Sequence, residues 1–328
     1  MKKALYEQRG PIPKEVIQAV EFEKPVLEPG QVLVEVLAAP INPSDLLTLT
    51  GQYGILPPLP AIGGSEGVGR VIELGPDVQN PPVGQTVLLP IGIGTWRTHL
   101  AVDANTLMPM PNEADPKQLA MITVNPPTAA LMLSEFVDLE QGDWVIQNTA
   151  NSGVGTYLVQ LAKIRGFKTV NIVRRESAVA GVQENGGDVT LVDGEDLAKR
   201  VAEATGGAKI KLGVDAVGGE ATTRIANCLC EEATIVSYGA MSGKPYSLPA
   251  TEIIFKDITF KGFWLAKWFK TASQEQRMAV FGELTQMIAS GKLQSNIQAT
   301  YDIDHIKEAV AAASQGERDG KIMVVPNW

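Results

Sequence analysis

The sequence predicts an α/β protein in which a doubly wound parallel sheet is combined with a β-rich domain. Three stretches support this prediction: a β-rich first hundred residues, alternating strand and helix patterns from about residue 119, and a short mixed tail. Strands that alternate with helices are typical of βαβ units around a parallel sheet. A chain of 328 residues has room for two domains of ordinary size.

The first hundred residues supply the β-rich part. Segments 31–37 and 68–74 alternate polar and apolar residues, and 83–89 adds a short apolar run. Gly- and Pro-dense stretches lie among them, and we expect these to be ordered loops that can carry functional groups. These stretches are 40–45, 51–69 and 80–84.

The middle of the chain supplies the parallel sheet. Short apolar segments alternate with helical patterns, which predicts successive βαβ units. The predicted strands are 144–147, 168–173, 189–192, 210–216 and 234–238. The predicted helices are 154–165, 177–185, 195–204 and 220–230.

The tail is too short to form a core of its own. Ser273 with Gln276 forms a capping box, and the helix that follows ends at Gly291. A second helix is expected over 304–314 and a last strand over 321–325. We therefore expect residues 269–328 to return to the domain formed by 1–118, with 119–268 as the second domain.

Composition excludes several classes of protein. Apolar residues make up 45% of the chain and charged residues 20%, as in globular proteins. A net charge of −9 lacks the basic footprint of a nucleic-acid partner, and no apolar run is long enough to predict a membrane span. Cys228 and Cys230 suit neither a disulfide framework nor a four-cysteine zinc lobe, and the first residues have no apolar signal segment. We expect a cytoplasmic protein.

A dinucleotide-binding turn is predicted where strand 144–147 runs into a helix. The connecting sequence, TANSGVG, has small residues at the three positions that a phosphate-binding turn requires, namely Ala150, Ser152 and Gly155. Backbone N–H groups at a helix N-terminus bind the pyrophosphate in such turns. Asn151 and Ser152 can donate further hydrogen bonds.

The end of the second parallel strand predicts which dinucleotide binds. NAD-binding proteins carry a carboxylate there, about twenty residues past the glycines, to bind the ribose 2′-hydroxyl. This chain has Arg174 and Arg175, and no acidic residue before Glu176. Two guanidinium groups can pair with a 2′-phosphate, so we expect NADPH as the cofactor.

Seven segments together resemble a known family. They are NPSD (42–45), GQYGILPPLPAIGGSEG (51–67), GTWRTH (94–99), VNPPTA (124–129), VIQNTANSGVG (145–155), YGAM (238–241) and IFKDITFKGFWLAKW (254–268). Over nearly its full length the chain resembles the medium-chain dehydrogenase/reductase superfamily, and most closely the mitochondrial-type trans-2-enoyl-thioester reductases. The resemblance implies a β-rich GroES-like catalytic domain and a Rossmann cofactor domain. It also implies a homodimer that joins the edges of two cofactor-domain sheets.

The resemblance also raises the question of zinc, because many members of the superfamily are zinc alcohol dehydrogenases. Asn42 stands at the position of their catalytic cysteine, and Ser65 at that of the histidine after the paired glycines. The remaining Asp45 and Glu66 cannot make a tetrahedral nitrogen and sulfur site. The two histidines, His99 and His305, are expected to be structural, so we expect no metal.

Tyr53 is the candidate catalytic acid. It lies in a Gly- and Pro-rich loop, and the resemblance places the family's catalytic tyrosine at this position. A phenol, with an ordinary pKa near 10, stays protonated at neutral pH and can donate a proton. Packing of the loop against its own domain is the alternative role for this side chain.

The resemblance implies a set of cofactor contacts. It assigns Asn125 to the nicotinamide end, 151–154 to the pyrophosphate turn and 174–176 to the 2′-phosphate site. The complete set is Asn125, Asn151, Ser152, Gly153, Val154, Arg174, Arg175, Glu176, Tyr238, Gly239, Ala240, Met241, Phe263, Trp264, Leu265 and Lys321. For Phe263 and Trp264, packing in the core or in a dimer interface is a compatible alternative.

The function expected from these residues is the NADPH-dependent reduction of an enoyl thioester, carried by coenzyme A or by an acyl carrier protein. An NADPH:quinone reductase with the same fold stays open, although Tyr53 and the GFWLAKW segment (262–268) favour the enoyl reductase. A non-catalytic NADPH-binding sensor is a third candidate. One departure from relatives is CEEA (230–233), where a basic Gly-Gly segment is common.

Overall fold

The computed structural model describes residues 1–326 and divides into two units. Unit 1 contains Met1–Val124 and the chain from Glu283 onward, and unit 2 contains Asn125–Gly282. The expected divisions after 118 and 268 fall earlier than these. α3 (Pro116–Leu119) packs on strands of unit 1, which keeps the segment before 124 in that unit. Phe269 stacks on Phe281 with ring centroids 5.9 Å apart, which keeps residues 269–281 in unit 2.

Unit 1 consists mainly of strands in two sheets. Its further helices are α1 (Pro13–Val16), α2 (Pro43–Thr50) and α12 (Ile306–Ser314). Its strands are β1 (Lys2–Tyr6), β2 (Ile17–Glu21), β3 (Gln31–Pro40), β4 (Ala61–Ile62), β5 (Val68–Leu74), β6 (Thr86–Leu88), β7 (His99–Asp103), β8 (Met108–Pro109), β15 (Ile297–Tyr301) and β16 (Lys321–Val324). The small sheet has the order β2-β1-β4. The large sheet has the order β15-β16-β3-β5-β6-β8, and β7 pairs with β3.

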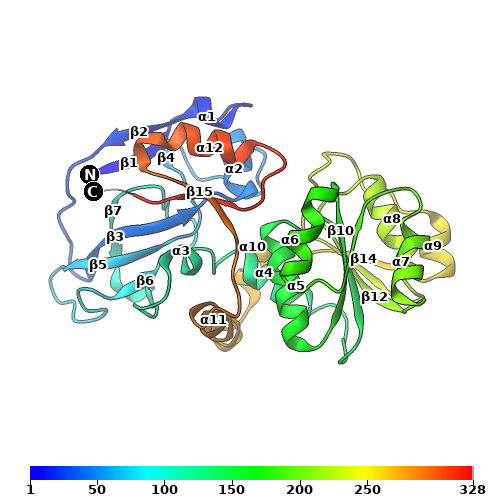
Figure 1. Ribbon diagram of the computed structural model, residues 1–328. Coiled ribbons are helices and arrows are strands. Elements are labelled where there is room, and N and C mark those ends of the chain that lie inside the picture. Colours follow the sequence, from blue (N-terminus) through cyan, green and yellow to red (C-terminus); the bar gives the residue numbers. More distant parts are fainter. Residues whose placement is uncertain (327–328) are drawn as a thin grey trace. The chain divides into compact units, whose positions relative to one another are not determined.

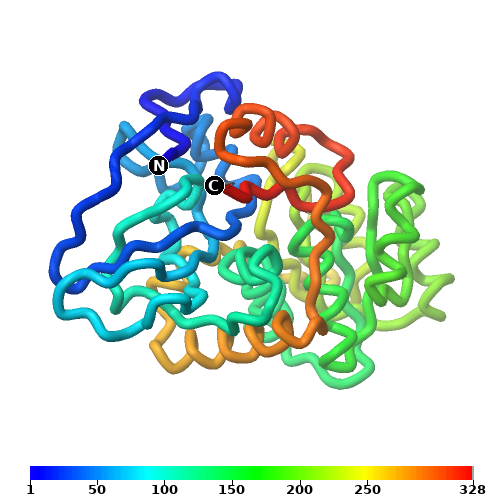
Figure 2. Tube along the Cα trace, turned by 60° about the vertical axis from the view of Figure 1, so that its left-hand side comes forward, coloured from blue at the N-terminus to red at the C-terminus, as the bar shows by residue number. Residues whose placement is uncertain are grey.

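The C-terminal segment completes unit 1, as the sequence predicts. β16 pairs antiparallel with the end of β3, and α12 packs against β2. Figure 2 shows this segment, in orange and red, returning among the blue and cyan segments of the N-terminal part. The fold therefore brings the two ends of the sequence into one hydrophobic core.

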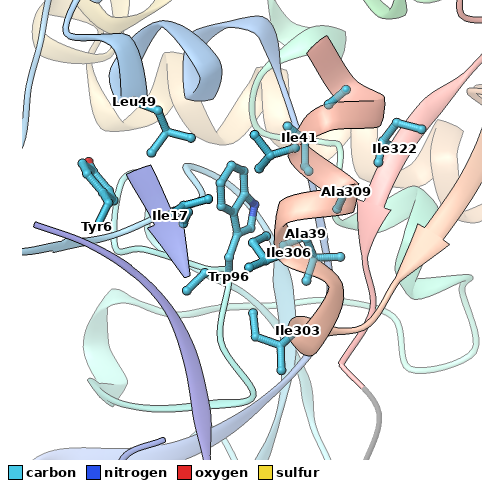
Figure 3. Packing of buried hydrophobic residues seen from close by; sticks show 14 of the residues in the cluster. Tyr6, Ile17, Ala39, Ile41, Leu49, Trp96, Ile303, Ile306, Ala309 and Ile322 are labelled. Carbon is cyan, nitrogen blue, oxygen red and sulfur yellow. The ribbon is translucent and has the colours of Figure 1, made fainter. Parts of the chain in front are cut away.

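That core surrounds Trp96, which is fully buried. Ile17, Ile41 and Leu49 pack around its ring, together with apolar residues of α12 and β16 (Figure 3). The indole Nε1 donates to the carbonyl of Pro40 at 3.2 Å, so its polar atom is satisfied. Leu49 anchors one face of α2 in this core, so the position of the helix is fixed by packing.

Unit 2 is a six-stranded parallel sheet with the order β11-β10-β9-β12-β13-β14. Its strands are β9 (Trp144–Gln147), β10 (Lys168–Val173), β11 (Val189–Val192), β12 (Ile210–Asp215), β13 (Thr234–Ser237) and β14 (Thr259–Gly262). Its helices are α4 (Asn125–Met132), α5 (Gly153–Arg165), α6 (Val179–Glu184), α7 (Leu197–Thr205), α8 (Glu220–Cys228), α9 (Ala250–Phe255) and α10 (Leu265–Thr271). α5 and α6 lie on one face of the sheet and α7 and α8 on the other (Figure 1). The doubly wound sheet is confirmed.

Two sequence expectations were wrong. Residues 40–45 were expected to be a loop, but α2 begins at Pro43 within them. Pro43 occupies the first helical turn, where its missing N–H costs nothing, and the Asp45 carboxylate accepts a hydrogen bond from the Asn42 N–H. The sheet also has a sixth strand, β14, where five were expected, because this short outer strand is mostly exposed and shows no apolar run.

α11 (Gln274–Ala289) crosses the division between the two units and begins with the predicted capping box. The Ser273 N–H donates to Gln276 Oε1 at 2.8 Å, and the Gln276 N–H donates to Ser273 Oγ at 3.1 Å. Among residues 1–326, no helix has the length and apolar character needed to cross a bilayer.

Candidate functional site

The turn that the sequence predicts to bind phosphate forms between β9 and α5 of unit 2. Ser152 is the N-cap of α5, and its hydroxyl accepts the Gly155 N–H at 3.1 Å. A Cβ on Gly155 would lie 2.5 Å from the carbonyl oxygen of Ala150, so only glycine fits there. The predicted turn is present, and Ser152 contributes its hydroxyl to the helix cap. Asn151 is exposed, and the binding of a pyrophosphate by the start of α5 stays a prediction.

Asn148 and Asp215 hold this turn beside β12, and neither belongs to the predicted set of site residues. Asn148 Nδ2 donates to Asp215 Oδ1 at 2.6 Å, and its Oδ1 accepts the Ala216 N–H at 2.8 Å. The Asp215 carboxylate also accepts the hydroxyl of Thr222 and the N–H of Val217. Polar residues directly at the ends of two buried strands are the sequence signal that would have identified them.

Arg174 and Arg175 follow the end of β10, which is the neighbour of β9. The Ala150 N–H donates to the Ile172 carbonyl at 3.2 Å, so the turn and the end of β10 lie side by side. Arg174 is exposed and Arg175 half-buried. The acidic residue at the end of β11, Asp193, is neutralised by Arg224, whose Nη2 lies 2.6 Å from its carboxylate. Positive charge therefore dominates at the end of β10, and Glu176 is exposed beside it.

Tyr238 connects the loop after β13 to the same turn. Its side chain is hydrogen-bonded to Thr149 and Ser152, and burial raises the pKa of its phenol, so it is protonated at neutral pH. Its backbone N–H donates to the Asp215 carbonyl at 3.0 Å, and the Met241 N–H donates to the Ala216 carbonyl at 3.0 Å. The 238–241 loop thus lies at the carboxyl edge of the sheet, where ligands bind in such folds.

The remaining predicted contacts of unit 2 lie on other segments. Asn125 begins α4 and is 5% exposed. The Phe263 N–H donates to the Ser237 carbonyl at 2.7 Å, and its ring meets that of Phe136 edge-on at 5.8 Å. Trp264 is 40% exposed and precedes α10, whereas Leu265 is buried. Phe263 therefore follows β14 at the carboxyl edge, and the packing role foreseen for its ring is present.

Tyr53 lies in unit 1 directly after α2. The helix ends at Gly51, which has a φ of 80°, and the Gln52 N–H donates to the Leu47 carbonyl at 2.8 Å. This pattern fixes the direction of the chain as it leaves the helix. Arg9 Nη2 donates to the Pro57 carbonyl farther along the loop. Tyr53 itself is half-buried and follows this fixed helix end by two residues.

A buried polar cluster lies at the start of α2, around Asn42, which the resemblance places at the position of a zinc-binding cysteine. We call Asn42, Asp45, Glu66 and Lys321 the polar cluster. Lys321 Nζ donates to Asn42 Oδ1, and Asn42 Nδ2 donates to Glu66 Oε1 at 2.7 Å. The resemblance assigns Lys321 to the cofactor; the structure gives its ammonium a buried partner in unit 1, and the cofactor role stays a prediction.

The polar cluster does not fit a catalytic zinc ion. An ammonium group points at Asn42, the residue that replaces a cysteine ligand, and no sulfur or imidazole ligand accompanies it. Within residues 1–326, no group of three or more His, Cys, Asp or Glu side chains could hold a metal. His99 lies on β7, and His305 pairs with Asp302 at 2.7 Å on the surface.

Comparison with known proteins places the chain in a family. Residues 28–112 match the alcohol dehydrogenase GroES-like domain, and residues 153–281 match the family described as zinc-binding dehydrogenase. The mitochondrial enoyl-[acyl-carrier-protein] reductase of Caenorhabditis elegans is 39% identical over 295 residues, which cover 88% of this chain and 85% of the relative. The chain belongs to the enoyl-[acyl-carrier-protein] reductase family of the medium-chain dehydrogenase/reductase superfamily.

Solved structures agree with this membership. A mitochondrial 2-enoyl thioester reductase heterodimer from Candida tropicalis superposes with a TM-score of 0.87 at 29% identity, covering 99% of both chains. A structure described as a complex of Etr1p, NADP and crotonyl-CoA gives a TM-score of 0.88 at 29% identity, with the same coverage. A Bacillus thuringiensis protein assigned as an NADPH:quinone reductase gives a TM-score of 0.89 at 27% identity. Solved structures with this fold thus include proteins named for two different reactions.

Proposed function

We propose that this protein is an NADPH-dependent reductase of the trans-2 double bond of an enoyl thioester. The observation that carries the proposal is Tyr53, which a fixed helix end presents in a unit whose would-be metal position is filled by the polar cluster. Relatives at 39% and 36% identity are named enoyl-[acyl-carrier-protein] reductases. A site with a proton donor and no metal suits the reduction of a conjugated double bond better than the reduction of a carbonyl group.

Unit 2 has the features that NADPH requires. The N–H groups at the start of α5 bind the pyrophosphate, where Gly155 allows the backbone to approach closely. Arg174 and Arg175 pair with the 2′-phosphate, which a carboxylate at this position would repel. When bound, NADPH supplies a hydride to Cβ of the substrate.

Reduction of a conjugated double bond needs little from the protein beyond positioning. As Cβ accepts hydride, negative charge moves to the thioester oxygen, and backbone N–H groups can stabilise that oxygen. Tyr53 donates its phenolic proton to Cα and so completes the saturated acyl thioester. Because the developing charge is delocalised over an enolate, no Lewis acid is required at the oxygen.

The substrate is an acyl chain linked to coenzyme A or to an acyl carrier protein. The net charge of −9 offers no extended basic face for an acidic carrier. Three exposed lysines, Lys261, Lys267 and Lys270, form a local positive region on β14 and α10 of unit 2. A carrier or the phosphates of coenzyme A would bind through such local charge.

The assembly is a homodimer that continues the sheet of unit 2 across β14. β14 is one of the two outer strands of that sheet, and the preceding helix α9 has no buried residue. On this helix, Ile254 is 68% exposed and Phe255 76% exposed. A second copy would bury both residues and satisfy the outer N–H and C=O groups of the strand. Phe255→Glu should turn a dimer into a monomer in light-scattering measurements, and an unchanged mass would contradict this interface.

We assign the enzyme to the cytoplasm, a reducing compartment that suits its two free cysteines. The curated relatives are named as mitochondrial proteins. Fractionation of the source cells, with immunodetection of the native chain, distinguishes the two compartments.

One spectrophotometric panel tests the function. NADPH oxidation is followed with crotonyl-CoA, longer trans-2-enoyl-CoA thioesters and 1,4-benzoquinone. Turnover of the thioesters above that of the quinone supports the enoyl reductase. The reverse order favours a quinone reductase, which the similarity to the Bacillus thuringiensis protein keeps as the second candidate. NADPH binding without turnover of any of them would indicate a sensor.

A further inference from the structure

The polar cluster is buried within unit 1. Three of its four members, Asp45, Glu66 and Lys321, carry ionisable side chains. Asn42 is 1% exposed, Glu66 0%, and Asp45 and Lys321 6% each. Burial raises the pKa values of both carboxyl groups and lowers that of the Lys321 ammonium. Burying charged groups is costly unless they are paired and hydrogen-bonded, so this arrangement calls for an explanation.

The Asn42 amide can adopt one orientation only. Its oxygen accepts from the Lys321 ammonium, and its nitrogen donates to the Glu66 carboxylate. A flipped amide would turn its N–H groups toward the ammonium and its oxygen toward the carboxylate, which are two repulsive contacts. The cation on one side and the anion on the other therefore hold this side chain in a single position.

Glu66 is itself held by donors from another segment. Its second oxygen, Oε2, accepts the Thr123 N–H at 3.0 Å and the Val124 N–H at 2.9 Å. Its backbone carbonyl accepts the Thr95 hydroxyl at 2.8 Å. The side-chain partners of the carboxylate are all N–H donors, so the ionised form satisfies each of these contacts.

Asn42 is also the residue from which α2 begins. Its backbone N–H donates to the Asp45 carboxylate at 2.7 Å, which joins the polar cluster to the first turn of the helix. Leu49 anchors the far turn against Trp96, as Figure 3 shows. α2 has eight residues and spans roughly 12 Å. Tyr53 follows its fixed end by two residues, so a shift at Asn42 moves the start of a short rigid segment that leads to Tyr53.

We propose that Glu66 and Asn42 are positioning residues for Tyr53, and that the polar cluster has taken over the place of a metal site in order to fix α2. The proposal rests on the proposed function, since it assigns to Tyr53 the proton donation in that reaction. Neither residue needs to touch the substrate. Both act by keeping the phenol at the distance and angle at which Cα is protonated, where displacements of about 1 Å cost up to roughly a hundredfold in rate.

The first experiment exchanges the carboxylate of Glu66 and the amide of Asn42 between the two positions. In Glu66→Gln, the new amide must turn its oxygen to the Thr123 and Val124 N–H groups, so its NH₂ opposes Asn42 Nδ2. Adding Asn42→Asp to the same chain replaces that opposing NH₂ by a carboxylate oxygen, which accepts from position 66, while the other carboxylate oxygen still accepts from Lys321. With crotonyl-CoA and saturating NADPH, kcat should fall at least about tenfold in Glu66→Gln and return to within about threefold in the exchanged variant.

The second experiment asks whether the loss passes through Tyr53. Glu66→Gln is combined with Tyr53→Phe, and the two single variants complete a double-mutant cycle. If Glu66 acts by positioning the phenol, it should change kcat less than about twofold once the phenol is gone. A purely structural role would lower kcat by the same factor in both backgrounds, because the whole unit would be loosened.

Controls keep the outcomes distinct. Glu35→Gln, a half-buried glutamate on β3 outside the polar cluster, should leave kcat unchanged. If Glu66→Gln does not fold, Asn42→Ser replaces it, since serine is a good helix N-cap but cannot bridge Lys321 and Glu66. An additive cycle, or no recovery in the exchanged variant, overturns the positioning role while crotonyl-CoA turnover by the unaltered enzyme stands. Absence of that turnover overturns the proposed function, and the positioning role with it.

Discussion

The phosphate-binding turn of unit 2 and the Tyr53 loop of unit 1 are held in place in different ways. In the turn, the hydroxyl of Ser152 caps α5 by accepting the N–H of Gly155, three residues ahead, and the Ala150 N–H donates to the adjacent strand. In front of the Tyr53 loop, Asn42 bonds to Lys321 across 279 positions and to Glu66 across 24. The first arrangement follows from strand, turn and helix succeeding one another, whereas the second exists only when distant segments meet.

The two regions also differ in charge. The contacts that fix the phosphate turn are mostly hydrogen bonds of neutral groups, apart from Asp215, which has four hydrogen-bond donors. The start of α2 instead depends on two buried carboxyl groups and one ammonium. A site that rests on buried charges responds to pH and to single substitutions more strongly than one that rests on backbone geometry. The following predictions use that difference, from the largest expected effect to the smallest.

Tyr53→Phe should have the largest effect. The ring and its packing remain, while the proton donor at Cα is lost. General acid catalysis contributes about 10²–10⁴-fold, so kcat with crotonyl-CoA should fall at least about a hundredfold while KM changes little. Steady-state kinetics measure this, with Tyr301→Phe, a half-buried tyrosine on β15, as the matched control.

Two further measurements on Tyr53→Phe separate catalysis from packing. NADPH affinity should be unchanged, and reduction of 1,4-benzoquinone should survive better, since it needs no proton at carbon. Near-normal crotonyl-CoA turnover would remove Tyr53 as the acid. A parallel loss of both activities with a lower melting temperature would mean that the hydroxyl only packs the loop.

Asp45→Asn should change how stability depends on pH. Burial raises the pKa of Asp45 from 3.8 to about 6. Between these values the folded chain retains a proton that the unfolded chain has lost, so stability falls as pH rises from about 4 to about 6. A shift of about two units corresponds to on the order of 3 kcal/mol, which Asp45→Asn should abolish. Urea unfolding at several pH values measures this, with exposed Glu113→Gln as the control; parallel curves for Asp45→Asn and the unaltered protein would refute it.

Replacing Arg174 and Arg175 should change only the affinity for the cofactor. The unaltered protein should bind NADPH at least about tenfold more tightly than NADH, since a charge-assisted hydrogen bond contributes about 1.5–3 kcal/mol. Arg174→Ala with Arg175→Ala should remove most of that preference by weakening NADPH binding. Calorimetric titration measures both affinities, and Arg70→Ala, on β5 of unit 1, is the matched control. Equal affinities of the unaltered protein for the two cofactors would contradict the role of these arginines.

Treatment with a chelator should have no effect. Asn42, at the position that the resemblance gives to a zinc-binding cysteine, accepts from the Lys321 ammonium, so kcat with crotonyl-CoA should be the same before and after EDTA dialysis. Loss of activity that added zinc restores would show that the enzyme depends on a bound zinc ion.

The sequence anticipated much of unit 2 because its signals are local. β9, β10 and β11 have the bounds expected from short apolar runs, and Gly155 was identified from its spacing to the strand. The sequence does not predict β14, because this outer strand has three exposed residues out of four and therefore no apolar run. The sequence does not predict α2 either, because Pro43 and Asp45 suit a loop as well as the start of a helix. The tertiary packing of Leu49 favours the helix.

By itself, then, the sequence determined the fold class, the phosphate turn, the basic pair after β10, and Tyr53 as the residue to test. Each of these depends on residues that are neighbours along the chain or on the period of a single strand or helix. Only the tertiary structure decided that Glu66, Asn42 and Lys321 meet, and that Asn148 bridges to Asp215. These contacts join segments far apart in the sequence, so the pairing of a buried amide with its ions appears only once the strands that carry them are in place.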